Sequence, residues 1–142
     1  MSAVGQNWGT QANALTTEMN SLGTSTYSSA GSSIDLADPG PLALVLEAVV
    51  AGANASNSAY TRFFALWSDD NSVFSDAESA TLHNAEEVGS IHVIGTGGNN
   101  RIWQIPVRAR YVKFMGLNSD STHALASTGN TLAYTPVFGD IT

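Results

Sequence analysis

The chain contains no cysteine, and this absence removes several kinds of chemistry. Without thiols it has no disulfide bridge, no thiolate metal site and no cysteine nucleophile. Basic residues are also scarce: five Lys and Arg stand against twelve Asp and Glu, which gives a formal net charge of −7. Because nucleic-acid binding needs clustered positive charge at the phosphates, we expect no nucleic-acid partner.

Long apolar runs are missing as well. The longest covers residues 41–52, is interrupted by Glu47 and is too short to span a bilayer, so we expect no membrane partner. Charged residues make up only 12% of the 142 residues, about half the usual share, and neutral polar and small residues replace them. A surface with few ions favours wide contact with neighbouring proteins, although an ordinary exposed surface would have the same composition.

Much of the remaining sequence consists of short β-type runs. Apolar, β-branched and aromatic residues gather in residues 42–50, 60–68, 88–94, 101–105, 109–117 and 131–135. Clusters of Gly, Asn, Asp, Ser and Pro separate these runs, as turns require. Some seven or eight short strands without alternating helices predict an all-β fold: an antiparallel β-sandwich of the jelly-roll kind.

Two patterns give finer expectations about these strands. Leu42, Leu44 and Leu46 alternate with the residues between them, so we expect all three on one buried face. Pro106 indicates either the end of its strand or an edge strand, and Pro136 is expected to end its strand, because proline has no N–H to donate to a neighbouring strand.

The first 33 residues differ in composition from the rest. They are rich in Ser, Thr, Asn, Gly and Gln, and their large apolar residues are sparse. Such a segment cannot bury enough surface by itself to offset the entropy lost on ordering. We therefore predict an extended N-terminal arm over residues 1–33 and a single β-sandwich domain over residues 34–142. A short helix over residues 12–22 is the alternative, because three apolar residues recur there at helical spacing.

The large apolar residues of this arm are candidate contacts with a partner. They are Trp8, Leu15, Met19, Leu22 and Tyr27. Trp8 stands in a polar surrounding with no local residue to pack on, which makes it the best candidate for an anchor in another subunit.

Four of the five cations form the second group of candidate partner-binding residues. Arg101, Arg108, Arg110 and Lys113 fall within one short segment. A basic strip on an acidic protein can dock an acidic patch of a partner. The alternative is that these are solvated strand positions or partners of nearby carboxylates, which contribute little to stability.

The sequence offers few candidates for catalysis or metal binding. Asp69, Asp70, Asp76 and Glu78 could together bind Ca²⁺, but their spacing is not that of an EF-hand, and a simple hairpin turn is the favoured explanation of Asp69 and Asp70. The histidines do not have a metal-ligand spacing, and no G-x-S-x-G nucleophile elbow occurs. We therefore expect no enzymatic activity and no cofactor.

Two runs of the chain resemble discoidin-like, galactose-binding β-sandwiches. They are F-A-L-W-S-D-D-N-S-V-F-S-D and I-P-V-R-A-R-Y-V-K-F, and the resemblance covers roughly residues 59–117. This chain has Asn71 where the turn of that family usually has Gly, and it lacks the cysteines that many such domains contain. Its sugar-binding loops cannot be matched residue by residue. No binding residues therefore transfer, but the resemblance implies a carbohydrate-binding module of a phage tail or host-recognition protein. Independently of it, Trp8, Trp67, Trp103 and Tyr111 could form a sugar-stacking platform, although core packing is the stronger expectation for Trp67 and Tyr111.

The whole chain, including its polar start and the run A-L-A-S-T-G-N-T-L-A-Y-T-P-V, resembles structural proteins of tailed-bacteriophage virions more closely. Capsid cement or decoration proteins are the nearest kind. This resemblance implies a β-sandwich or jelly roll, frequently a homotrimer, that lies on the capsid surface across joints between major capsid protein subunits. The expected function is thus non-enzymatic stabilisation of the phage head, and the carbohydrate-binding module is the alternative.

Overall fold

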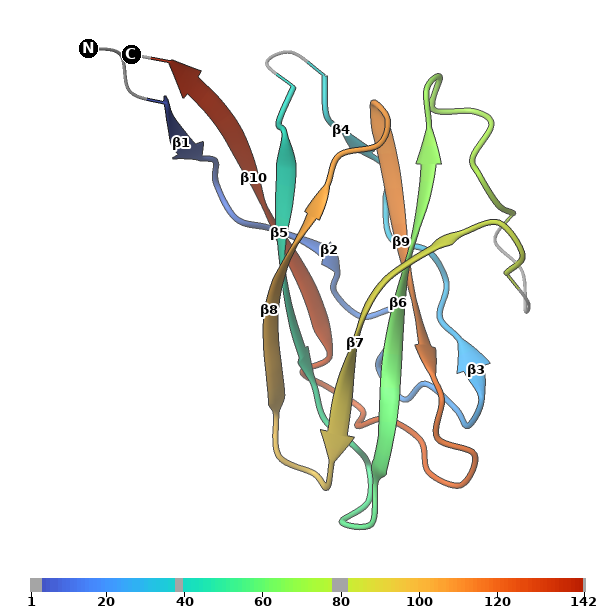
Figure 1. The fold of residues 1–142 in the computed structure, drawn as a ribbon. Helices are drawn as coiled ribbons and strands as arrows, with labels where there is room; N and C mark the ends of the chain where they lie inside the picture. Colours follow the sequence, from blue (N-terminus) through green and yellow to red (C-terminus); the bar gives the residue numbers. More distant parts are fainter. Residues whose placement is uncertain (1–3, 38–39, 78–81, 142) are drawn as a thin grey trace.

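The computed structural model describes residues 4–37, 40–77 and 82–141, and every regular element among them is a β-strand (Figure 1). Sequence alternation and β-branched residues explain the longer strands. The ten strands are β1 (Val4–Trp8), β2 (Ala12–Leu15), β3 (Thr26–Tyr27), β4 (Ile34–Asp35), β5 (Ala43–Val50), β6 (Ser58–Ser68), β7 (Glu86–Ile94), β8 (Asn99–Pro106), β9 (Tyr111–Asn118) and β10 (Thr131–Ile141). No helix among the described residues is long and apolar enough to cross a membrane.

The strands form two antiparallel sheets that pack face to face (Figure 1). Sheet A has the order β1-β10-β5-β8, and β2 pairs with β10 on the same side as β1. Sheet B has the order β3-β9-β6-β7, and β4 pairs with β9 on the same side as β3. If β1 with β2 and β3 with β4 are each counted as one interrupted strand, consecutive strands alternate between the sheets as in a jelly roll, except that β6 and β7 form a hairpin within sheet B. The predicted fold class is therefore confirmed.

The core lies between the two sheets and takes one face from each long strand. On β5 the inward residues are Leu44, Leu46, Ala48 and Val50, all fully buried. Phe63 of β6 and Phe114 of β9 face them from sheet B and are equally buried. Leu42 differs from our expectation: it precedes β5 and is 66% exposed, because the strand begins only at Ala43.

The N-terminal segment pairs with both sheets of this sandwich. β1 and β2 complete the edge of sheet A beside β10, and β3 completes the edge of sheet B beside β9. The connection from β2 to β3 therefore crosses from one sheet to the other. Residues 12–22 contain β2 and turns in place of the alternative helix.

Three apolar residues of this crossing segment fill the core. Leu15 and Met19 are fully buried, and Leu22 is 8% exposed. Met19 lies against Gly116 of β9, where a Cβ atom would come within 2.6 Å of the Met19 sulfur. The sparse apolar residues of the polar segment thus find their burial in long-range contacts within the same chain, which local composition does not show.

The last strand is longer than the sequence predicts. β8 ends at Pro106 as expected, but β10 continues through Pro136 to Ile141. Pro136 lies opposite the break between β1 and β2, where its carbonyl accepts a hydrogen bond from the N–H of Gly9 at 2.7 Å. The strand tolerates this proline because the neighbouring edge strand is interrupted there.

Candidate interaction surfaces

The outer face of sheet A combines apolar and polar side chains, and its residues Val137, Ala43 and Ala133 are buried within the chain. Strand alternation leaves every second residue of β10, β5 and β8 on this face, and the strand register aligns them in rows. The rows are Val137–Ala43–Pro106, Thr135–Val45–Gln104 and Ala133–Glu47–Ile102. Glu47 is the one charged side chain in these rows, and its carboxylate accepts a hydrogen bond from the Gln11 amide at 2.8 Å.

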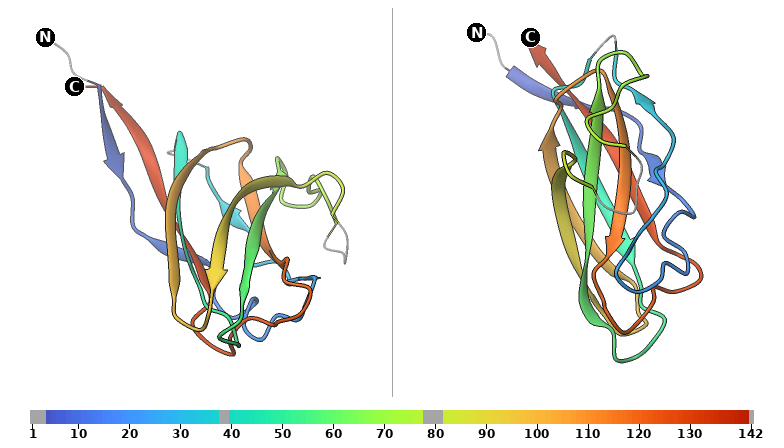
Figure 2. Two further views of the ribbon diagram at one scale, coloured as in Figure 1. Left: turned by 60° about the horizontal axis from the view of Figure 1, so that its bottom comes forward. Right: turned by 90° about the vertical axis from the view of Figure 1, so that its right-hand side faces the viewer.

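A two-stranded ribbon projects from one end of this sheet. It consists of β1 and residues 137–141 of β10, which leave the body of the sandwich together (Figures 1 and 2). Trp8 in β1 is 60% exposed. Within the described part of the chain β1 pairs with β10 alone, so the hydrogen-bonding groups on its outer edge face away from the sheet.

The sequence of β1 leaves this edge open to another strand. The run V-G-Q-N-W contains no charged residue and no proline, the devices by which natural edge strands avoid pairing with other chains. A two-stranded ribbon alone is only marginally stable in water. Contact with a partner along β1 would therefore stabilise the ribbon as well as bind the partner.

The outer face of sheet B is more polar and carries an aromatic stack. Tyr60 of β6 and His92 of β7 are cross-strand neighbours whose rings lie 4.7 Å apart and nearly parallel, at 16°. Next to them the Arg62 guanidinium donates two hydrogen bonds of 2.7 Å to the Glu87 carboxylate. This bidentate bond raises the pKa of Arg62 and lowers that of Glu87. Tyr60, Arg62, Glu87 and Ser90 share a shallow hollow of about 450 Å³.

The four basic candidates do not form one strip. Arg108 pairs with Glu86 at 3.1 Å, and Arg110 pairs with Asp35 at 3.2 Å. Arg101 lies at the edge between the sheets, over the ring of Trp103, and donates a hydrogen bond to the carbonyl of Ser90. Lys113 lies on the outer face of sheet B over the ring of Phe74, 4.4 Å from its centre. The structure thus favours the alternative in which Arg108 and Arg110, in the β8–β9 connection, form ion pairs with nearby carboxylates.

The apolar candidates of the N-terminal segment have different positions. Trp8 is exposed on the ribbon, and its role as an anchor remains a prediction. Leu15, Met19 and Leu22 lie in the core of this chain, so they do not face a partner. Tyr27 of β3 is half-buried and packs against Phe64 with ring centres 5.7 Å apart. Of these candidates, Trp8 remains part of a candidate interaction surface, together with the outer face of sheet A. The sequence did not indicate that face, because only the strand register shows which residues lie side by side on it.

The acidic candidates organise a loop on the outside of sheet B. The Asp70 carboxylate accepts backbone hydrogen bonds from Ser72 and Val73, which lower its pKa. Asn71 has a φ of +62°, so it takes the left-handed conformation for which related turns use Gly. Asp69 is exposed beside this turn, and Glu78 lies outside the described residues.

Asp76 closes the far end of the same loop. Its carboxylate accepts hydrogen bonds from the backbone N–H groups of Ala77, His83, Asn84 and Ala85, which lower its pKa. Among the described residues no group of three acidic or histidine side chains is placed to hold a metal ion. The hydrogen bonds of Asp70 and Asp76 hold the backbone of this loop.

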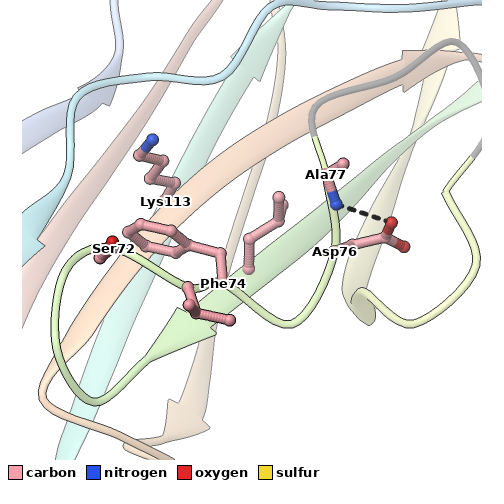
Figure 3. A pocket seen from close by; sticks show the side chains of 7 residues that line it. Ser72, Phe74, Asp76, Ala77 and Lys113 are labelled. Carbon is pink, nitrogen blue, oxygen red and sulfur yellow. Dashed lines mark hydrogen bonds between the residues drawn. The ribbon is translucent and has the colours of Figure 1, made fainter.

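Figure 3 shows the hollow that this loop forms with sheet B. Phe74 lies under Lys113, while the Asp76 carboxylate points away from both toward the backbone of Ala77. The hollow measures about 370 Å³, and Leu66 forms part of its wall. The loop folds back over an apolar part of the sheet, so its main effect is to cover that part.

Three of the four aromatic residues considered for sugar stacking pack against other residues of the sandwich. Trp103 packs against the core, and its indole N–H donates to the carbonyl of Val88 at 2.8 Å. Trp67 also packs against the core and donates to Glu86 at 3.3 Å, while Tyr111 lies under the guanidinium of Arg110. The exposed aromatic stack on sheet B is instead made by Tyr60 and His92.

No protein-family model matches this sequence, and no curated protein shows significant similarity to it.

The carboxylates of this protein predict that acid destabilises it. Hydrogen bonds from the backbone of Thr122 and His123 lower the pKa of Asp120 despite its burial, so the unfolded chain takes up a proton at higher pH than the folded chain does. We expect the free energy of unfolding to be nearly constant above about pH 5 and to fall below about pH 4, where an unfolded Asp titrates. Urea unfolding followed by tryptophan fluorescence across pH 2.5–7 measures this profile.

Asp120→Asn should lower stability at neutral pH and flatten the acid-dependent part of the curve. Asp69→Asn is the matched control, because Asp69 is exposed and accepts no hydrogen bond from the described residues. Identical pH profiles for the wild type and Asp120→Asn would contradict the assignment.

Proposed function

We propose that this chain is a non-enzymatic structural protein of a tailed-phage virion, a cement or decoration protein that binds across subunits of the major capsid protein on the capsid surface. The projecting ribbon is the observation that carries this proposal. It offers an unpaired strand edge and an exposed tryptophan to a partner, and it extends beyond the body of the sandwich (Figure 2).

This role requires a surface that can bind a partner without a large free-energy cost for removing charged groups from water. Trp8 can bury a large apolar surface in a pocket of the partner, as aromatic anchors do in many interfaces. The edge of β1 can pair with a strand of the partner through main-chain hydrogen bonds. Since the β1 sequence has no ionised side chain, its burial avoids the cost of removing ions from water.

A second candidate function is binding of a carbohydrate by the outer face of sheet B. The Tyr60–His92 stack and the Arg62–Glu87 pair place an exposed aromatic surface beside planar hydrogen-bonding groups in one hollow. A sugar ring presents one apolar face and a rim of hydroxyl groups, so both parts of this site would find a counterpart. This arrangement would suit a host-recognition module.

The capsid proposal predicts that the protein is a component of assembled particles. Phage particles that contain this chain should release it under mild denaturing conditions and take up purified wild-type protein again. Trp8→Ala should bind them about 30-fold more weakly, because loss of an interface anchor typically costs about 2 kcal/mol or more. Val73→Ala, which removes an exposed side chain from the loop outside sheet B, should bind normally.

Occupancy of the particles is measured by mass spectrometry and by electron cryomicroscopy. Absence of the chain from purified particles, or full binding by Trp8→Ala, would speak against this function.

The carbohydrate alternative predicts a glycan-array signal that depends on sheet B. Tyr60→Ala should weaken binding roughly tenfold, which corresponds to about 1.4 kcal/mol of lost ring contact. Trp8→Ala is the control, because it removes an exposed aromatic ring from the other sheet and should leave the signal unchanged. An array without any glycan signal for the wild-type protein would exclude the alternative for the sugars tested.

A further inference from the structure

Two shallow hollows adjoin each other at the β7 edge of sheet B. One is the hollow beside the Arg62–Glu87 pair, and the other measures about 520 Å³ and lies where β7 meets β8. Tyr60 and Ser90 line both hollows, so the exposed ring of Tyr60 forms a wall that the two have in common. A ligand longer than one sugar ring would therefore contact both hollows.

The second hollow contains Arg101, which differs from the other arginines of the chain. Each of the other three pairs with a carboxylate, whereas Arg101 forms no ion pair among the residues that the structure describes. Its guanidinium lies over the ring of Trp103, 5.1 Å from the ring centre, and donates one hydrogen bond to the carbonyl of Ser90. These two contacts fix the guanidinium in place, and its remaining N–H donors are left for a ligand.

The other groups of the second hollow are neutral. None of the described residues that line it carries a carboxylate. Asn100 is exposed, and within the described part of the chain its side chain forms no hydrogen bond. The Nε2 atom of His92 lies 2.8 Å from the carbonyl oxygen of Ser58, which can only accept a hydrogen bond. Nε2 therefore carries a proton, and the Nδ1 atom of the neutral ring is left as an acceptor.

The first hollow has no uncompensated charge to offer. The Arg62 guanidinium already donates two hydrogen bonds to the Glu87 carboxylate, so the charges of this pair offset each other. Beside the pair, the ring of Tyr60 is 52% exposed and can contact the apolar face of an uncharged sugar. The charge that can select a ligand thus lies at the Arg101 end.

We propose that the two hollows together bind an acidic oligosaccharide, with a neutral sugar ring on Tyr60 and the carboxylate of a uronic acid at Arg101. A carboxylate can accept two parallel hydrogen bonds from a guanidinium, which fixes its orientation as well as its charge. Asn100 and His92 would bind hydroxyl groups of the same sugar. In a chain of net charge −7, an anion needs a local cation of this kind to be held.

This inference rests on the carbohydrate-binding alternative and names the class of sugar for it. It does not conflict with the capsid role, because the ribbon consists of β1 and β10 of sheet A, whereas the hollows lie at the β7 edge of sheet B. A protein held on a capsid by its ribbon would keep both hollows open to a glycan.

A glycan array that places each acidic sugar beside its neutral counterpart tests the inference. The probes are oligosaccharides that contain glucuronate or galacturonate, and the same oligosaccharides with glucose or galactose in that position. We expect the wild type to bind at least one acidic form about tenfold or more tightly than its neutral counterpart, because charge-assisted hydrogen bonds are the strong ones. Added salt should reduce this preference, since Arg101 is exposed.

Arg101→Gln should abolish the preference for the acidic form and leave binding of the neutral form nearly unchanged. Arg110→Gln is the matched control, because it removes the same charge from outside both hollows. Arg110 also lies over an aromatic ring, 4.9 Å from the centre of Tyr111, but it already pairs with Asp35. This control should keep the preference of the wild type.

Asn100→Asp is a second variant that removes no hydrogen bond of the described structure. It places a carboxylate in the second hollow and should weaken binding of the acidic form by repulsion, while the neutral form binds as before.

The outcomes separate this inference from the function on which it rests. Equal binding of acidic and neutral forms by the wild type would overturn the inference and leave the carbohydrate alternative in place. Equal effects of Arg101→Gln and Arg110→Gln on the preference would do the same. An array without any glycan signal would overturn both.

Discussion

The packing of the N-terminal segment between the sheets is the constraint on which the rest of the structure depends. β1 and β2 complete sheet A, β3 completes sheet B, and the connection between them inserts Leu15 and Met19 into the core. The buried side-chain amide of Asn118 fixes this connection, because it donates hydrogen bonds to the carbonyls of Leu22 and Gly23. Without the segment, β10 would become an open edge, β9 would keep only the short β4 beside it, and the core would lose its cover on that side.

This arrangement determines which surfaces remain for a partner. A segment that completes the fold is not available as a long binding arm, so contact with other proteins falls to the ribbon and to the outer faces of the sheets. The two faces differ in kind: sheet B holds ion pairs and an aromatic stack, while the rows on sheet A contain small, apolar and neutral polar side chains and one carboxylate, that of Glu47. A protein that combines a projecting edge with a nearly uncharged face is suited to assembly, where many weak contacts add together.

The sequence predicted the fold class well because alternation and turn chemistry are local properties. The strands around Leu44, Phe63 and Phe114 follow from patterns that can be read over a few residues. The strand pairing of the N-terminal segment does not follow from the sequence, because its apolar residues are too widely spaced to show a period and obtain their burial from strands about 100 residues away. The candidate surfaces were only partly predictable. Trp8 stands out in the sequence, whereas the rows on sheet A and the Tyr60–His92 stack exist only through strand register.

Hydrogen exchange of the free protein tests the central claim most directly. If the N-terminal segment is part of the sandwich, the amides that pair with β9 and β10, such as those of Gly9, Gly31 and Ser28, should exchange almost as slowly as those of β5 and β6. Their N–H groups donate to the carbonyls of Pro136, Phe114 and Gly116. Exchange of these amides at the rates of an unstructured peptide, with β5 and β6 still protected, would contradict the account and restore the picture of a separate arm.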